Sequence, residues 1–113
     1  MKYMMLVCAD ELAELSQAQR ALVPAATHEW VTEMKDRGIR LTGDQLSAVS
    51  DATTVRVRDA EVLLSDGPFA ETKEQIAGFD IIECADLDQA IEVAAKHPVA
   101  SFGSIEVRPF RQP

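Results

Sequence analysis

The segment DGPFAETKEQ, residues 66–75, places a chain reversal beside an aromatic ring and several ionisable side chains. Asp66 is the first candidate for chemistry, because a partly desolvated carboxylate has a raised pKa and can act as a general acid or base near neutral pH. Gly67 and Pro68 predict the reversal, and loops held by a sheet often carry binding groups. The alternative is that Asp66 only makes the backbone hydrogen bond typical of an Asp-Gly turn.

The residues after the turn predict a binding surface for a small anionic ligand. Phe69 is expected to be buried beneath the loop, with Glu71 and Lys73 beside it. Thr72 and Gln75 have the spacing of a capping box, and the free amides of a capped helical turn would attract an anion next to Lys73. The alternative is a solvated loop in which the charges pair weakly at the surface.

His28 and Asp44 are further candidates for acid–base chemistry. His28 lies on a predicted helix, roughly 200° around the axis from Trp30 and away from the apolar stripe, so the alternative is a solvated surface histidine. Asp44 follows Gly43 in a predicted strand, where a bulge would aim the carboxylate at a cavity.

The last predicted strand alternates apolar and charged residues, so Glu106 and Arg108 should share the sheet face away from the helices. Buried there, they must form ion pairs, with each other or with Asp80. Arg108 is also a candidate for holding an anionic substrate.

Composition narrows the classes of function. The 113 residues suit one domain, 1–113, and 47% hydrophobic content is ordinary for a globular protein. A net charge of −8 argues against a nucleic-acid partner. No run is long enough for a membrane span, and Cys8 and Cys84 are expected to be reduced thiols in a cytoplasmic protein. There is no phosphate-binding glycine loop, no H-E-x-x-H and no His/Cys cluster, so we expect no metal, nucleotide or flavin cofactor.

The periodicity predicts an α+β domain with the order β-α-β, hairpin, β-α-β, which is a ferredoxin-like βαββαβ fold with an inserted β-hairpin. Ser16 and Gln19 form a capping box for the long helix, and Pro24 should kink that helix or end an irregular first turn. His97 is expected to end the second helix as a cation that complements the helix dipole. The predicted strands are 3–9, 39–46, 53–58, 61–65, 78–84 and 104–110, and the predicted helices are 16–37 and 87–96.

Two helices can cover only one face of a four-stranded sheet, yet the first strand is apolar on both faces. Leaving its second face in water would expose a contiguous apolar patch. The sequence therefore predicts a homodimer packed sheet to sheet; the alternative is that the inserted hairpin folds across its own sheet. The side chains at issue are Tyr3, Met5 and Val7 on one face and Met4, Leu6 and Cys8 on the other.

Six segments together resemble the DGPF-domain branch of the YCII-related family: MKYM (1–4), ATTVR (52–56), DGPFAETKE (66–74), AGF (77–79), DLDQA (86–90) and GSIEVRP (103–109). The resemblance implies a small bacterial protein that forms a dimeric α+β barrel. It implies a histidine–aspartate pair in the sites of related proteins, which keeps His28 as a candidate, although the family position falls on Thr27. The family usually has Gly where Ala60 stands in the hairpin turn.

Three functional hypotheses follow. The first is a cofactor-independent enzyme that isomerises or eliminates from a small organic acid or lactone, with Asp66 as acid or base and Lys73 and Arg108 holding the anionic group; dimeric α+β barrels host such reactions, which is an analogy of fold. The second is a non-catalytic ligand-binding or regulatory module, and the resemblance implies a link to extracytoplasmic-function (ECF) sigma factors. The third is a dimer in which residues 66–75, here called the signature loop, have a purely structural role.

Overall fold

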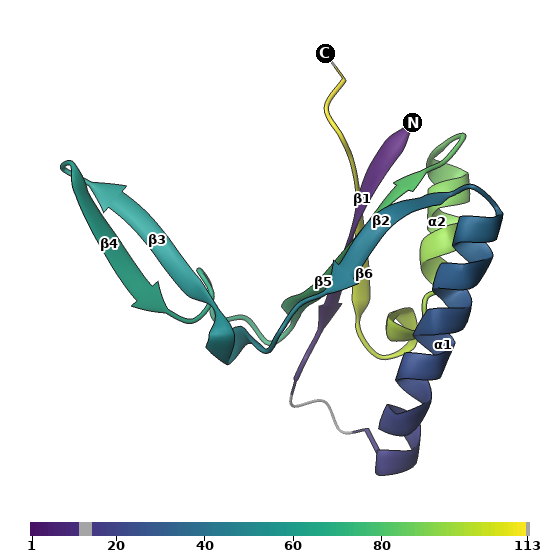
Figure 1. The fold of residues 1–113 in the computed structure, drawn as a ribbon, viewed down its shortest axis with the longest axis horizontal. Helices are drawn as coiled ribbons and strands as arrows, with labels where there is room; N and C mark the ends of the chain where they lie inside the picture. Colours follow the sequence, from purple (N-terminus) through teal and green to yellow (C-terminus); the bar gives the residue numbers. More distant parts are fainter. Residues whose placement is uncertain (12–14, 113) are drawn as a thin grey trace.

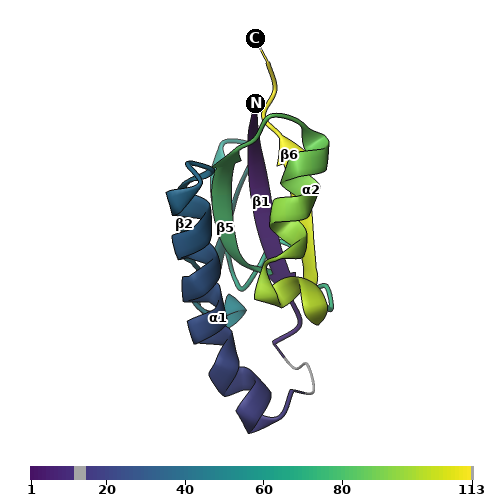
Figure 2. The same cartoon turned by 90° about the vertical axis from the view of Figure 1, so that its right-hand side faces the viewer.

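The computed structural model describes residues 1–11 and 15–112, which form one antiparallel four-stranded sheet, a separate two-stranded hairpin, two α-helices and two short 3₁₀ helices. The sheet has the strand order β2-β5-β1-β6, and both α-helices cover the same face of it (Figures 1 and 2). The predicted ferredoxin-like fold with an inserted hairpin is therefore confirmed. The elements are β1 (Lys2–Ala9), α1 (Gln17–Asp36), β2 (Arg40–Gln45), η1 (Val49–Asp51), β3 (Thr53–Arg58), β4 (Glu61–Asp66), β5 (Gln75–Glu83), α2 (Leu87–Ala95), η2 (Pro98–Ser101) and β6 (Ser104–Pro109).

The first α-helix begins where its cap predicts. The Ser16 hydroxyl accepts the Gln19 amide at 3.0 Å, and the Gln19 side chain accepts the Ser16 amide at 2.8 Å. Pro24 lies inside α1 without ending it. The apolar stripe packs inward as predicted, with Trp30 and Met34 buried, and the Trp30 indole N–H donates to the Val93 carbonyl at 2.9 Å. This bond fixes α1 against α2 over the core.

The strand β1 separates two different surfaces. Its odd-numbered side chains, including Met5, are buried under the helices with Ile82 and Val93. Met4, Leu6 and Cys8 face the other way and stay half-buried in the protomer. Leu6 pairs with Phe79 and Met4 pairs with Ile81 across the ladder to β5. We call this surface the open sheet face; it comprises Met4, Leu6, Cys8, Phe79 and Ile81.

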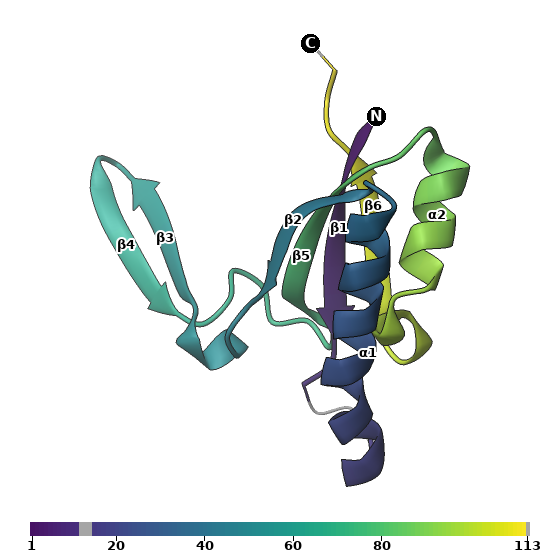
Figure 3. The same ribbon diagram turned by 45° about the vertical axis from the view of Figure 1, so that its right-hand side comes forward.

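The hairpin β3–β4, residues 53–66, forms an arm that projects from the sheet on the side of the open sheet face (Figures 1 and 3). Every residue of β4 is exposed. The alternative in which the hairpin folds across its own sheet is therefore wrong for the protomer. No helix among the described residues is long and apolar enough to cross a membrane.

The arm closes through a two-residue turn, although the residue at position 60 is Ala where the family usually has Gly. Arg58 pairs with Glu61, and both turn residues have positive φ, 50° at Asp59 and 64° at Ala60. Two consecutive positive φ values match the twist of a hairpin. Ala60 holds this left-handed conformation without the freedom of a glycine, so the turn carries local strain.

Candidate functional site

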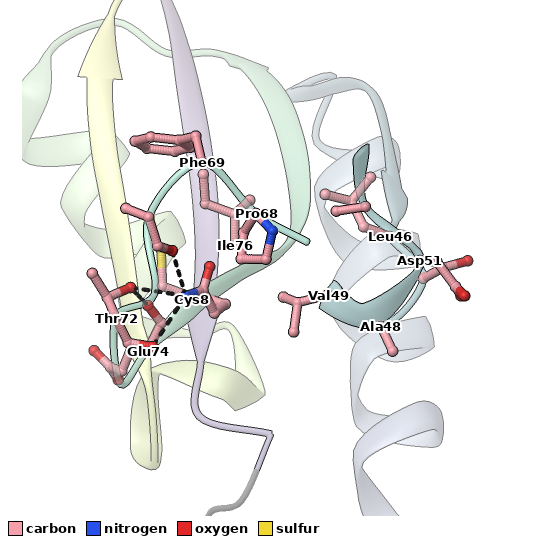
Figure 4. A pocket seen from close by; sticks show the side chains of 14 residues that line it. Cys8, Leu46, Ala48, Val49, Asp51, Pro68, Phe69, Thr72, Glu74 and Ile76 are labelled. Atoms are coloured by element: carbon pink, nitrogen blue, oxygen red, sulfur yellow. Dashed lines mark hydrogen bonds between the residues drawn. The ribbon is translucent and has the colours of Figure 1, made fainter. Parts of the chain in front are cut away.

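The signature loop borders a groove of about 390 Å³ between the base of the arm and the edge of the sheet (Figure 4). Pro68 and Phe69 contribute from the loop, and Cys8 and Ile76 contribute from β1 and β5. Phe69 is 75% exposed, so the expectation that it is buried is wrong within one protomer. The groove is largely apolar and open.

The predicted capped turn at residues 72–75 does not form. Gln75 reaches back instead, and its amide donates to the Ala70 carbonyl at 2.9 Å and to the Thr72 carbonyl at 3.0 Å. Residue 75 already belongs to β5, which starts three residues earlier than predicted. The loop therefore offers no helix N-terminus to an anion, and Glu71 and Lys73 are exposed on its outside.

Asp66 is the last residue of β4, paired with Thr53, and it is exposed. The turn after it is held by backbone groups: the Gly67 amide donates to the Ala52 carbonyl at 2.7 Å, and the Thr54 hydroxyl donates to the Gly67 carbonyl at 2.9 Å. Gly67 has a φ of 96°, which requires glycine. Asp66 does not line the groove, so its catalytic role stays a prediction that needs burial from outside the protomer.

A second hollow, the helix-side cavity, lies under the helices on the opposite side of the sheet. It measures about 420 Å³ and lies between α1, β2, β5 and the segment that carries η2. Its walls are mainly aliphatic, and its polar groups converge from distant parts of the chain. They are His28, Arg40, Asp44, Asp80 and His97.

A buried ion pair forms the polar centre of this cavity. The Arg40 Nε donates to Asp80 Oδ1 at 2.8 Å, and the two side chains are 14% and 8% exposed. Burial raises the pKa of Asp80, and the bond and charge of Arg40 oppose that rise. A carboxylate in this environment is a stronger proton acceptor than a solvated one.

Asp80 faces the helices because it pairs with the buried Met5 on β1. It therefore cannot reach Glu106 or Arg108, which pair with each other on the other side of the sheet. Of the two predicted pairings, the one between Glu106 and Arg108 is confirmed, and the one with Asp80 is wrong. Both residues of that surface pair are exposed in the protomer, so they are less buried than expected.

Gly43 makes room for the ion pair. A Cβ at this position would lie 2.3 Å from Asp80 Oδ1 and 2.8 Å from Arg40 Nη2. The irregularity in β2 falls between Arg40 and Thr42, just before the predicted bulge at Gly43. Asp44 is exposed at the cavity edge, where its Oδ1 accepts the Gln45 amide at 2.8 Å.

His97 lines the cavity as a neutral ring. It is buried, packs edge-on against Trp30 with ring centroids 4.9 Å apart, and burial lowers its pKa to about 4. Its Nδ1 accepts the Val99 amide at 3.1 Å, so the neutral imidazole carries its proton on Nε2. The prediction that His97 ends α2 as a cation is wrong, because α2 is capped by Lys96 and His97 caps the following η2.

The comparisons with known proteins fit this geometry. The sequence model of the YCII-related domain matches residues 1–112. The chain belongs to the YCII-related domain family. An uncharacterised protein of Rhizobium meliloti (strain 1021) is 48% identical over 67 residues, a match that covers 58% of this chain and 54% of the relative, so the matched region spans about half the relative's length.

This YCII-related domain also resembles a solved structure, 5-chloro-2-hydroxyhydroquinone dehydrochlorinase from Burkholderia phenoliruptrix AC1100 in complex with 2,5-dihydroxybenzoquinone. The TM-score is 0.53 at 13% identity, and the similarity covers 100% of this chain and 96% of the dehydrochlorinase. At this identity the similarity supports the shared fold and leaves the site to be argued from its own residues.

In the structure of this YCII-related domain, some of the site residues predicted from the sequence line the groove or the helix-side cavity, and others line neither. His28 and Asp44 lie at the helix-side cavity, and Phe69 lies at the groove. The residues that line neither hollow are Asp66, Glu71, Lys73 and Arg108.

Arg40, Asp80 and His97 are the cavity groups that sequence reasoning did not assign to a site. Asp80 was visible as a single charge inside the apolar run of β5, and such a charge must be paired when buried. Within residues 1–11 and 15–112, no three His, Cys, Asp or Glu side chains gather where they could hold a metal ion.

Proposed function

We propose that the helix-side cavity is the active site of a cofactor-independent acid–base enzyme that promotes elimination or isomerisation of a small ring or carbonyl compound. The observation that carries this proposal is the buried Arg40–Asp80 pair, which opens into an apolar cavity beside the neutral His97. Buried ionisable groups with shifted pKa values, facing one cavity, are typical of catalytic sites.

Each polar group has a role that follows from its chemistry. Asp80 is the general base, since burial raises its pKa and makes it a stronger proton acceptor than a solvated carboxylate. Arg40 uses one N–H on Asp80, and its remaining donors can hold an oxygen that becomes negative. Among the described residues, no other group hydrogen-bonds to the His97 ring, so its Nε2–H can stabilise the same oxygen without a change in charge.

The reaction needs no oxidant or reductant. Asp80 removes a proton either from a hydroxyl group, which leaves the electron pair on that oxygen as an oxyanion, or from a carbon next to a carbonyl, which moves the pair into an enolate. In both cases Arg40 holds the oxygen that carries the negative charge. In an elimination, the bond to a leaving group breaks and the group departs as an anion, for a net loss of acid. In an isomerisation, Asp80 returns the proton to a different atom of the same molecule.

The cavity favours a compact substrate with few polar atoms. Its volume of about 420 Å³ falls in the ~300–1,000 Å³ range of ligand pockets. Val23, Val31 and Val99 supply apolar walls, which suits one ring or a short carbon chain. The dehydrochlorinase with the similar fold acts, by its name, on a chlorinated hydroxylated ring, and this supports the same class of substrate and reaction by analogy of fold.

The small organic acid or lactone predicted from the sequence stays within this class, with one change. Lys73 and Arg108 lie away from the cavity, so Arg40 takes the part of the cation that holds the anionic oxygen. The competing proposal keeps Asp66 as the acid or base, in a site that a second protomer would have to enclose.

One experiment separates the two carboxylates. A thermal-shift screen of hydroxylated aromatics, quinols, lactones and small organic acids identifies ligands, and NMR then measures uptake of deuterium from solvent at their acidic carbons. We expect Asp80→Asn to slow this exchange by about 100-fold or more, the usual contribution of a general base. Asp66→Asn serves as the matched control and should leave the rate unchanged.

Three results would count against the proposal. Exchange that survives in Asp80→Asn removes Asp80 as the base, and exchange that is lost in Asp66→Asn restores the competing site. Ligands that bind without exchange or turnover favour the alternative of a regulatory binding module, for which a link to an ECF sigma factor becomes the next question. Circular dichroism of both variants checks that the fold is retained.

A further inference from the structure

One hydroxyl group at the wall of the helix-side cavity has no part in the chemistry proposed above. Val23, Thr27 and Val31 follow one another at intervals of four residues, so they lie in one row along α1. All three line the cavity, and each is half-buried. The row is aliphatic except for the hydroxyl of Thr27.

The Thr27 hydroxyl makes no hydrogen bond to any other group within residues 1–11 and 15–112. A threonine inside a helix often donates to the carbonyl four residues earlier, which here belongs to Val23, but this bond is not made. The oxygen is not sealed off from solvent. A half-buried hydroxyl among apolar walls needs a partner, so it must take one from water or from a ligand in the cavity.

The other polar groups of the cavity already have partners in the protein. Arg40 and Asp80 bond to each other at 2.8 Å, and His97 accepts a backbone amide through Nδ1. Asp44, at the edge, accepts the amide of its neighbour at 2.8 Å. Thr27 therefore adds a neutral donor and acceptor whose full bonding capacity is open to a ligand.

Thr27 and the ion pair belong to opposite walls of the cavity. Arg40 lies on β2 and Asp80 lies on β5, both in the sheet, whereas Thr27 lies on one of the two helices that cover that face of the sheet (Figure 2). A small molecule that fills the space between helix and sheet would meet the ion pair at one end and the Thr27 hydroxyl at the other.

We propose that Thr27 determines the substrate specificity of this cavity by binding a second, neutral oxygen of the substrate, across from the oxygen that Arg40 and His97 hold. The preferred substrate is then a small compound with two oxygen substituents, such as a dihydroxylated ring or a hydroxyketone. This inference rests on the proposed function and narrows its class of substrate.

The charges at the cavity require the second oxygen to be neutral. Among the described residues that line the cavity, Arg40 is the only lysine or arginine, and it is already paired with Asp80. Asp44 adds a further carboxylate at the edge. A carboxylate of the substrate placed at Thr27 would have no cation to balance it, so a hydroxyl or carbonyl oxygen is favoured over a second acid group.

An isosteric exchange tests the role of this hydroxyl. Thr27→Val removes the oxygen and keeps the branched shape of the side chain. Thr32→Val is the matched control, because it makes the same change at an exposed position of α1 that does not line the cavity. The probes are phenol and the dihydroxybenzenes catechol, resorcinol and hydroquinone. The chain has a single tryptophan, and Trp30 packs against His97, so its indole N–H signal reports binding by NMR.

At least one dihydroxybenzene should bind the wild-type protein about fivefold more tightly than phenol, which is the effect of one neutral hydrogen bond. Thr27→Val should lose this advantage and Thr32→Val should keep it, while the affinity for phenol stays within about twofold in all the proteins. Thr27→Val should also melt at or above the wild-type temperature, because it loses no hydrogen bond within the protein.

Four results would overturn the inference: no gain from a second hydroxyl in the wild type, a gain that survives in Thr27→Val, no probe that moves the Trp30 signal, or a fall of more than about 5 °C in the melting temperature of Thr27→Val, which would make the hydroxyl structural. Failure here is distinct from failure of the proposed function. Phenol that binds without any gain from a second hydroxyl leaves the exchange test of Asp80 unaffected, and exchange that survives in Asp80→Asn removes the base while the binding role of Thr27 stands.

Discussion

Acidification should destabilise this protein through His97. The folded state holds the pKa of His97 at about 4, below the ordinary value of 6.5, because burial disfavours the imidazolium. As the pH falls below 6.5, the unfolded chain takes up a proton that the folded chain refuses until about pH 4. Stability is therefore complete above pH 6.5 and is lost as the pH falls toward 4.

The size of the effect follows from the same pKa. A change from 6.5 to about 4 is equivalent to about 3 kcal/mol at 1.36 kcal/mol per pKa unit. Water that enters the cavity beside the ring screens part of this penalty, so we expect a loss of about 2–3 kcal/mol in the free energy of unfolding between pH 7 and pH 4.

His97→Asn isolates this contribution. An asparagine side chain can still accept the Val99 amide that His97 Nδ1 accepts now, so η2 keeps its cap while the titrating ring is lost. Loss of the ring contact with Trp30 should cost about 1 kcal/mol at pH 7. Urea unfolding at pH 7, 6, 5 and 4 should show the wild-type advantage of about 1 kcal/mol at pH 7 reverse, so that His97→Asn is the more stable protein by about 1–2 kcal/mol at pH 4.

The comparison of wild type with His97→Asn cancels the contributions of the other titrating groups to the pH dependence of stability. The raised pKa of Asp80 acts with the opposite sign, because the folded state takes up that proton first, but it is present in both proteins. His28→Asn, which removes the other histidine of the chain from an exposed position on α1, is the control for loss of a histidine. Parallel profiles for wild type and His97→Asn, or an NMR titration that places the His97 midpoint near 6.5, would refute the reasoning.

Three exchanges that involve glycine test the backbone. Gly43→Ala should displace the Arg40–Asp80 pair, since its Cβ would lie 2.3 Å from the carboxylate; we expect a loss of about 3–5 kcal/mol, read as a fall in melting temperature of about 10 °C or more. Gly38→Ala is the matched control: its φ of 71° is strained but nothing lies within 4 Å, so its cost should stay near 1 kcal/mol, and equal shifts would contradict the steric argument. Ala60→Gly should relieve the strained turn and slow hydrogen exchange of the arm amides up to about fivefold, as 1 kcal/mol implies; unchanged exchange would mean that the turn is unstrained.

The fold was predictable from the sequence because each element carries a local signal. The Ser16–Gln19 capping box starts α1, alternation of apolar residues marks the strands, and the register of the hairpin follows from its two-residue turn. The boundary that sequence reasoning misplaced is the start of β5, where Gln75 bonds to loop carbonyls instead of closing a helical turn. In a capping box the Gln75 side chain would accept a backbone amide, whereas here it donates to backbone carbonyls. A glutamine side chain can do either at the same spacing, so spacing could not decide between them.

The candidate site was harder to predict because its groups are distant in sequence. Arg40, Asp80 and His97 come from β2, β5 and the segment before η2, and no local spacing relates them. The sequence predicted the site at residues 66–75 instead, because so many ionisable side chains beside an aromatic ring are unusual for a turn. Which face of β5 carries Asp80 depends on strand register, a tertiary property.

That register connects the signature loop to the cavity. In β5, Ile76 pairs with Cys8 while Gly78 pairs with Val7, so Ala77 is an extra residue in a bulge. Side chains alternate strictly along a regular strand, and positions 76 and 80 would then share a face. The bulge breaks this rule: Ile76 lines the groove on one side of the sheet, and Asp80 lines the helix-side cavity on the other.

A one-residue slip here would turn Asp80 out of the cavity and onto the open sheet face. The bulge is held by the Leu46 amide, which donates to the Ala77 carbonyl at 2.8 Å, and by the loop that Gln75 anchors immediately before it. The signature segment can therefore govern the chemistry of the cavity without contributing a side chain to it, because it determines where β5 begins. On this reasoning, residues 66–75 matter because they position Asp80. The exposed carboxylate of Asp66 is not needed to explain their importance.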